Sequence, residues 1–126
     1  MTRNNAEAHA HLGVSYLRQN RPADAIGPFE QAIAIRPRLK EAHTGLGAAF
    51  RMTGQPERAI LSHLAALEID RNQPVVYANL GVAYEDNHNY TEAERNLREA
   101  LRLDPSLDSA RSALNRVLLA QGKPAE

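Results

Sequence analysis

A 34-residue step runs through almost the whole chain of 126 residues and limits its possible folds more than any other feature. At this step a leucine–glycine pair recurs, followed three residues later by an aromatic residue: Leu12, Gly13 and Tyr16, then Leu46, Gly47 and Phe50, then Leu80, Gly81 and Tyr84. Small and aliphatic residues keep the same step: Ala25, Ala59 and Ala93, then Ala32, Ala66 and Ala100, then Ile35, Ile69 and Leu103. A fixed period of this length predicts stacked structural repeats.

Each repeat contains two helical stretches, because apolar and small residues recur at the spacing of one helix face. Turn signals separate the stretches, as at Asn20-Arg21-Pro22 and Gly54-Gln55-Pro56. A seventh stretch repeats the pattern of a first helix, either as a cap or as the start of a truncated fourth repeat. We therefore divide the chain into an N-terminal extension, three hairpins, this helix and a tail, at residues 1–5, 6–39, 40–73, 74–107, 108–121 and 122–126.

These repeated positions resemble the tetratricopeptide repeat (TPR), whose pattern is Trp-x2-Leu-Gly-x2-Tyr, then Ala-x3-Phe, then Pro. The first repeat supplies His9, Leu12, Gly13, Tyr16, Ala25, Phe29, Ala32 and Pro37. The resemblance implies an all-α, right-handed superhelix of helix-turn-helix repeats (an α-solenoid), with three TPR units plus a C-terminal helix. It also implies a concave inner surface, which the family uses to hold peptides or helices.

The second repeat departs most from this pattern. His63 stands where an aromatic residue is expected, and Arg71 stands where the closing proline is expected. We therefore expect a softer second repeat. In the first repeat, Gly27-Pro28 falls in the middle of a helix, where proline removes a backbone donor, and this predicts a local bend.

A stripe opposite the packing positions of each first helix is the candidate binding surface. Its central residues are small or apolar, whereas a helix face left in water normally carries charge along its length. A crowded concave surface would favour small residues even without a ligand, so this alternative stays open. The predicted peptide-binding residues are Ala10, Val14, Leu17, Arg18, Thr44, Ala48, Arg51, Met52, Ala78, Asn79, Val82 and Glu85.

TPR domains that grip chaperone C-termini resemble one another in a clamp of Lys, Asn and Arg on this face. Here Val14, Ala48 and Val82 occupy the place of a clamp asparagine or arginine, and only Asn79 fits that pattern. We therefore predict an extended or helical peptide with apolar anchors. Arg18 and Arg51 could still pair with an acidic partner, and Glu85 and Asp86 could pair with a basic one.

Other function classes find little support. Basic and acidic residues number 15 each, so nothing indicates nucleic acid, and there is no cysteine. His9 and His11, two residues apart on a helix, point in nearly opposite directions and cannot chelate a metal together. No nucleophile motif or phosphate-binding loop occurs. We expect no enzyme activity, cofactor, metal, nucleic acid or membrane partner, and a cytoplasmic location.

The alternative function is a structural spacer or self-association module of a larger protein, acting through the ends of the stack. If no second helix of a fourth repeat follows, Val117, Leu118 and Leu119 are expected to be half covered, which would permit a homo-oligomer through the C-terminal helix. Leu61 and Leu64 fall on the outer face and leave a convex binding patch as a lesser possibility.

Overall fold

Seven helices make up the fold, and residues 5–126, which a computed structural model of the chain describes, contain no strand. The helices are α1 (Ala6–Arg18), α2 (Pro22–Ile35), α3 (Lys40–Met52), α4 (Pro56–Ile69), α5 (Pro74–Asp86), α6 (Tyr90–Leu103) and α7 (Asp108–Ala120). Of the extension predicted at residues 1–5, only Asn5 lies within the described residues; its side chain accepts a hydrogen bond from Ala8 N at 2.9 Å and caps α1. The predicted all-α repeat fold is confirmed.

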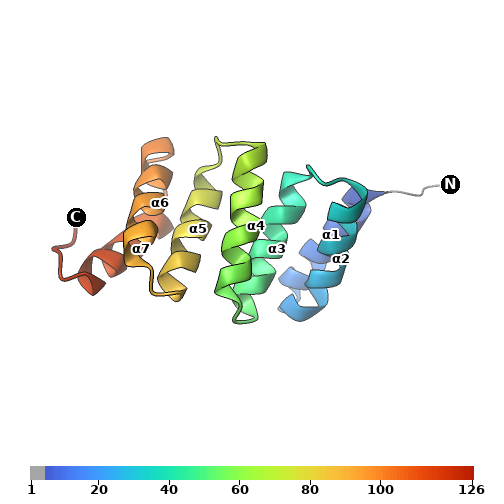
Figure 1. Cartoon of the computed structure of the whole chain (residues 1–126), viewed down its shortest axis with the longest axis horizontal. Coiled ribbons are helices and arrows are strands. Elements are labelled where there is room, and N and C mark those ends of the chain that lie inside the picture. The colour runs from blue at the N-terminus through green and yellow to red at the C-terminus, as the bar shows by residue number, and fades with distance from the viewer. Residues whose placement is uncertain (1–4) are drawn as a thin grey trace.

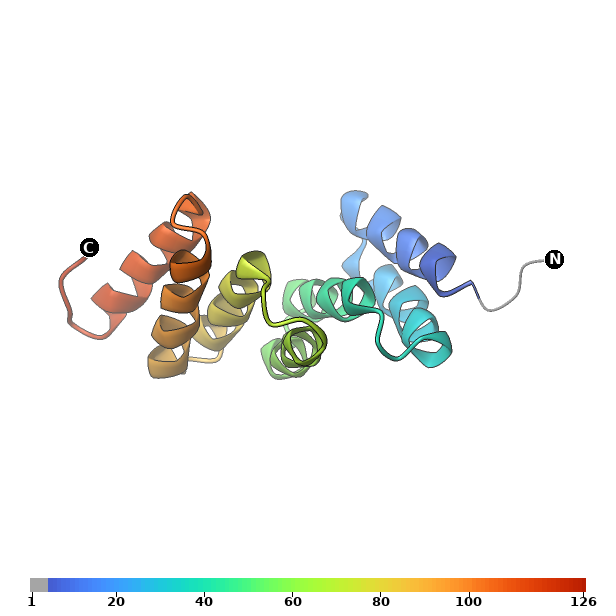
Figure 2. The same cartoon turned by 90° about the horizontal axis from the view of Figure 1, so that it is seen from above.

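The helices form a curved array rather than a compact bundle (Figure 1). Each helix packs on the next, and the first helices of neighbouring hairpins also touch, α1 with α3, α3 with α5 and α5 with α7. Within residues 5–126 no comparable contact joins the second helices α2, α4 and α6 to one another. The first helices therefore lie on the inner, concave side of the arc, whose two ends rise on the same side of its middle in Figure 2.

The turn after each of α1, α3, α5 and α7 passes through the left-handed region of the backbone at the same place in the repeat. The residues there are Asn20, Gly54, His88 and Gly122, with φ angles of 59°, 77°, 59° and 74°. The next backbone N–H in each turn donates to the carbonyl five residues back, as Arg21 does to Tyr16 at 2.9 Å and Gln55 to Phe50 at 2.8 Å. Such turns satisfy the free carbonyls at the end of each first helix.

The repeated glycines allow the two helices of a hairpin to approach closely. A methyl group at Gly13 would lie 2.7 Å from the ring of Phe29, and one at Gly81 would lie 2.6 Å from Cγ of Leu97. Gly45, on α3, presses on the same Phe29 ring from the next hairpin. The Phe29 side chain is completely buried and joins α1, α2 and α3 in one core.

The repeated leucines of the first helices are buried only where a hairpin precedes them. Leu46, Leu80 and Leu114 are at most 7% exposed, but Leu12 is 45% exposed. Leu12 therefore holds the repeated leucine position without packing like its counterparts. The reason is that within residues 5–126 no helix precedes α1 to cover this side.

Helix α2 continues through Gly27-Pro28 as one helix, so the proline does not break it. A Cβ before proline would clash with the proline ring in a helix. Gly27 has no Cβ, which removes this obstacle, and the missing donor of Pro28 remains the main cost to the helix.

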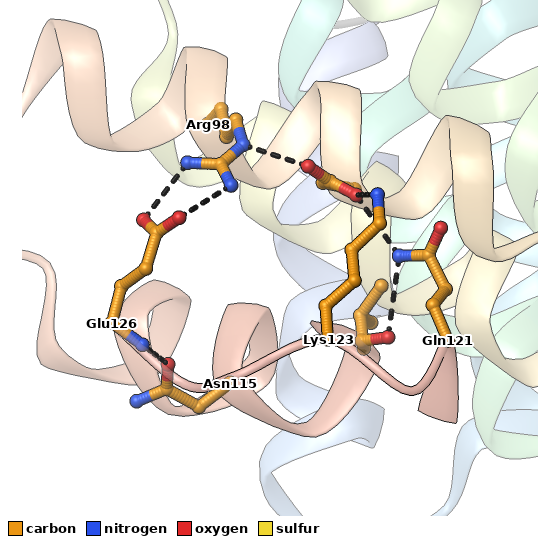
Figure 3. A network of polar contacts seen from close by, with 7 residues as sticks. Arg98, Asn115, Gln121, Lys123 and Glu126 are labelled. Atoms are coloured by element: carbon orange, nitrogen blue, oxygen red, sulfur yellow. Dashed lines mark hydrogen bonds and ion pairs between the residues drawn. The ribbon is translucent and has the colours of Figure 1, made fainter. Parts of the chain in front are cut away.

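The C-terminal tail folds back over α6 and α7 (Figure 3). Arg98 donates from both terminal nitrogens to the carboxylate of Glu126, at 2.9 and 2.7 Å, and Glu126 N donates to Asn115. Lys123 and Gln121 both donate to Glu94, at 2.9 Å. The hydrogen bond from Lys123 has the largest effect on Glu94, and together with the hydrogen bond from Gln121 it helps to lower the pKa of Glu94 to about 2.

The apolar edge predicted on the last helix is smaller than expected. Val117 and Leu118 are at most 1% exposed, because the core around α6 and α7 includes them, and only Leu119 remains open, at 64%. The expectation of three half-covered side chains is therefore wrong, and the premise for self-association at this end is weakened. On the outer face, Leu61 is 67% and Leu64 42% exposed, as predicted.

Gly45→Ala tests the close approach of α3 to Phe29. Alanine favours an isolated helix by about 1 kcal/mol over glycine, but here the new methyl overlaps the Phe29 ring, which also lies close against Gly13. We expect a net loss of about 1–3 kcal/mol in the free energy of unfolding, measured by urea denaturation. In a Phe29→Leu background the loss should be smaller, and a stabilised Gly45→Ala variant would contradict the packing described above.

Candidate binding groove

Three adjoining hollows follow the concave side of the array. The N-terminal hollow, of about 360 Å³, lies between α1 and α3 and is lined by Glu7, Ala10, His11, Val14, Leu39 and Glu41. The central hollow, of about 400 Å³, is lined by Val14, Leu17, Glu41, Thr44, Gly45, Ala48, Gln73, Val75 and Val76. The third, which we call the His63 pocket, has a volume of about 180 Å³ and is lined by Ala48, Arg51, Met52, His63, Asn79 and Val82.

The hollows form one continuous groove, because neighbours share lining residues. Val14 and Glu41 belong to both the N-terminal and the central hollow, and Ala48 belongs to both the central hollow and the His63 pocket. Much of the lining is apolar, and two large apolar side chains are open to water, Met52 at 48% and Val75 at 55% exposure. The groove therefore offers apolar surface for a ligand.

Most of the residues predicted from the sequence lie along this groove, namely Ala10, Val14, Leu17, Thr44, Ala48, Arg51, Met52, Asn79 and Val82. Ala78 differs, because it lines none of the three hollows and packs in the core between α5, α6 and α7. Arg18 and Glu85 line none of the three hollows.

Sequence reasoning missed residues that reach the groove from outside the first-helix stripe. Leu39 and Gln73 come from the connections between hairpins, and His63 comes from the second helix α4. For His63 a signal existed, since it interrupts the repeated position held by Phe29 and Leu97.

The charges beside the groove pair with one another across neighbouring hairpins. Arg51 Nε donates to Asp86 at 2.6 Å, which joins α3 to α5. Arg116 donates to both carboxylate oxygens of Glu85, at 3.0 and 2.9 Å, which joins α7 to α5. The prediction that these residues wait for a charged partner is therefore incomplete, because Arg51, Glu85 and Asp86 already have partners within the chain. The two pairs leave this part of the groove without net charge.

His63 is a polar residue in the position of a core residue. Its side chain is 1% exposed, and Nδ1 is buried without a hydrogen-bond partner. A methyl group at Gly47 would lie 2.6 Å from Cε1, so the ring lies against the backbone of α3. Burial, and secondarily the positive charge of Arg51, lowers the pKa of His63 to about 4. The ring is therefore neutral at neutral pH.

Family comparison agrees with the repeated geometry. Tetratricopeptide repeat models match residues 2–39, 12–74 and 74–107. The chain belongs to the tetratricopeptide repeat family. Its hairpins are accordingly TPR units, and its curved array of paired helices is a TPR superhelix.

Two curated relatives illustrate how far the likeness extends. A human protein O-mannosyl-transferase, TMTC3, is 32% identical over 88 residues, which are 69% of this chain but 10% of that protein. The Hsp70-Hsp90 organising protein of Plasmodium falciparum is 26% identical over 112 residues, or 89% of this chain and 44% of that protein. The chain thus spans less than half the length of either relative.

The fold is also that of solved TPR structures. The first TPR domain of Spaghetti (RPAP3), bound to the HSP90 peptide SRMEEVD, superposes with a TM-score of 0.90 and covers 94% of each chain. At 19% identity this likeness concerns the fold.

Other kinds of site find no support in the described part of this TPR chain. No group of three or more His, Cys, Asp or Glu side chains in residues 5–126 is arranged to hold a metal ion. None of the helices α1–α7 has both the length and the apolar character needed to cross a bilayer.

His63 should make the stability of the chain depend on pH. An unfolded histidine titrates near 6.5, so between this value and the folded pKa of about 4 the unfolded chain binds more protons. The stability due to the neutral ring is complete above the unfolded pKa and is lost as the pH falls toward the folded pKa. From pH 7 to 4 we expect this loss to reach roughly 3 kcal/mol in urea denaturation.

The variant His63→Leu, which copies Leu97 of the next repeat, is the matched control. It should lose this part of the pH dependence while keeping the part due to carboxylates such as Glu94. Equal slopes for both proteins between pH 7 and 4 would show that burial does not hold His63 neutral.

Proposed function

We propose that this TPR chain is a protein-interaction scaffold that holds an extended or helical peptide of another protein in its concave groove. The continuous line of hollows from α1 to α5 is the observation that supports this function. A groove lined by apolar side chains on a rigid helical scaffold suits a peptide whose own apolar side chains act as anchors. The peptide-bound Spaghetti structure shows that the same fold can hold a peptide.

The anchors of this peptide are proposed to be apolar rather than a terminal carboxylate. The N-terminal and central hollows present Ala10, Val14, Leu17 and Val75. Near the His63 pocket the one arginine of the lining, Arg51, already pairs with Asp86. An acidic peptide end would have to compete with this ion pair, whereas an apolar side chain would simply cover exposed surface.

The role is proposed to be binding without catalysis. The human mannosyl-transferase shares only a 10% segment of its length with this chain, and that segment is matched here by TPR units. No group of His, Cys, Asp or Glu side chains in residues 5–126 is arranged beside the groove to hold a metal ion. The chemistry named in that relative therefore gives no reason to expect the same activity in this array.

Charge placed in the groove should abolish peptide binding. In an Ala48→Glu, Val82→Glu double variant, two carboxylates lie where an apolar anchor would pack, and a buried carboxylate without a partner is strongly unfavourable. We expect partner capture from a lysate of the source cells, quantified by mass spectrometry, to fall at least about tenfold. Synthetic peptides that together cover the sequence of the captured protein are then titrated with the chain, and fluorescence anisotropy gives the affinity of each peptide.

The control carries the same kind of change on the outer side of the array. Ala34 of α2 and Leu61 of α4 are both exposed, so Ala34→Glu, Leu61→Glu adds the same charge away from the groove. It should capture the partner like the wild type, with equal helicity by circular dichroism. Loss of capture in this control alone would place binding on the convex face.

Self-association through a stack end is the second candidate, and the exposed Leu12 on α1 favours it. The equivalent leucines of later repeats are covered by the hairpin before them, so a second molecule could cover this one. If so, the mass from light scattering should rise with concentration in the wild type, and Leu12→Glu should remain a monomer. A constant monomeric mass for the wild type removes this candidate.

A further inference from the structure

The His63 pocket has a polar floor that core packing does not explain. Phe29 and Leu97 hold the equivalent positions of the other hairpins and are completely buried, without any polar atom. His63 fills the same place, yet its buried Nδ1 has no partner. Buried polar groups in proteins nearly always have partners. Because His63 also lines the open pocket, its ring is a candidate group for hydrogen bonding to a ligand there.

The pocket has the size of one side chain. Its volume of about 180 Å³ lies well below the roughly 300–1,000 Å³ of pockets that hold drug-sized ligands. Apolar walls from Ala48, Met52 and Val82 surround polar groups from His63, Asn79 and Arg51. An occupant must therefore have an apolar stem and a small polar end.

The polar end should carry no net charge. The ring of His63 is neutral at neutral pH because its pKa lies at about 4, and the charge of Arg51 is balanced by Asp86 at 2.6 Å. A carboxylate would thus find no uncompensated cation, and an ammonium group would meet the guanidinium of Arg51. An aliphatic end would leave the imidazole and the amide of Asn79 without partners.

A carboxamide matches these groups. Its carbonyl oxygen accepts from an imidazole N–H, an amide N–H or the free guanidinium nitrogens, and its NH2 donates to the oxygen of Asn79. We propose that the His63 pocket is a subsite for one asparagine or glutamine side chain of the bound peptide. This subsite rests on the proposed function, since it describes one anchor of the peptide in the groove.

A carboxamide fragment tests the subsite without knowledge of the partner. Propionamide is titrated into the 15N-labelled full chain, and the backbone amides of Ala48 and Val82 and the side-chain amide of Asn79 are followed by NMR. We expect saturable shifts at these groups, and shifts with propionate, at matched ionic strength, that are at least about tenfold weaker. No saturable shift, or equal binding of propionate, would overturn the proposal.

Variants separate hydrogen bonding from simple filling of the pocket. His63→Leu should weaken propionamide binding roughly tenfold, and Asn79→Leu should do the same if His63→Leu folds poorly. His88→Leu, at an exposed turn, should bind like the wild type. Unchanged binding in both His63→Leu and Asn79→Leu would mean that His63 and Asn79 do not hydrogen-bond to the amide of propionamide.

The outcomes for this subsite and for the groove can be told apart. If propionamide fails while Ala48→Glu, Val82→Glu still abolishes partner capture, the groove binds a peptide but the carboxamide subsite is wrong. If propionamide binds but capture survives that double variant, the pocket is real and the proposed function is wrong.

Discussion

The contact between a glycine on the first helix and a large side chain on the second determines the rest of this structure. Gly13 meets Phe29, Gly47 meets His63 and Gly81 meets Leu97, and in each hairpin a single methyl group would collide with the partner. This close approach fixes how the two helices cross and therefore how the next hairpin stacks. Because the first helices touch along the array and the second helices do not, the stack curves and its inner face is hollowed.

Periodicity is sufficient to predict the helices and their pairing. The glycine, leucine and alanine positions repeat without slip, and this repeat sets which helices pair as hairpins. The inner stripe could also be located from sequence, because one face of a first helix must point away from its own second helix. For this reason residues such as Val14, Ala48 and Val82 lie where they were expected.

What periodicity misses depends on interactions between repeats and at the ends of the array. The exposure of Leu12 and the burial of Val117 follow from which neighbour is present, a property of the array rather than of one repeat. The Arg51–Asp86 and Arg116–Glu85 pairs join residues 35 and 31 positions apart, a distance that single-helix patterns do not reveal. Ala78 was placed on the stripe from its helical angle alone, although the core around α7 covers it.

The place of His63 shows how a core position of a TPR unit can also face the groove. The residue that packs against the glycine of α3 belongs to the second helix, yet its ring lines the pocket between α3 and α5. A polar residue there weakens the core of its own hairpin, because burial of an unpaired group is unfavourable. The same residue gives the groove a directional group that alanines and valines cannot supply. One side chain therefore has to serve both the core and the binding surface, and in the second repeat that side chain is the polar His63.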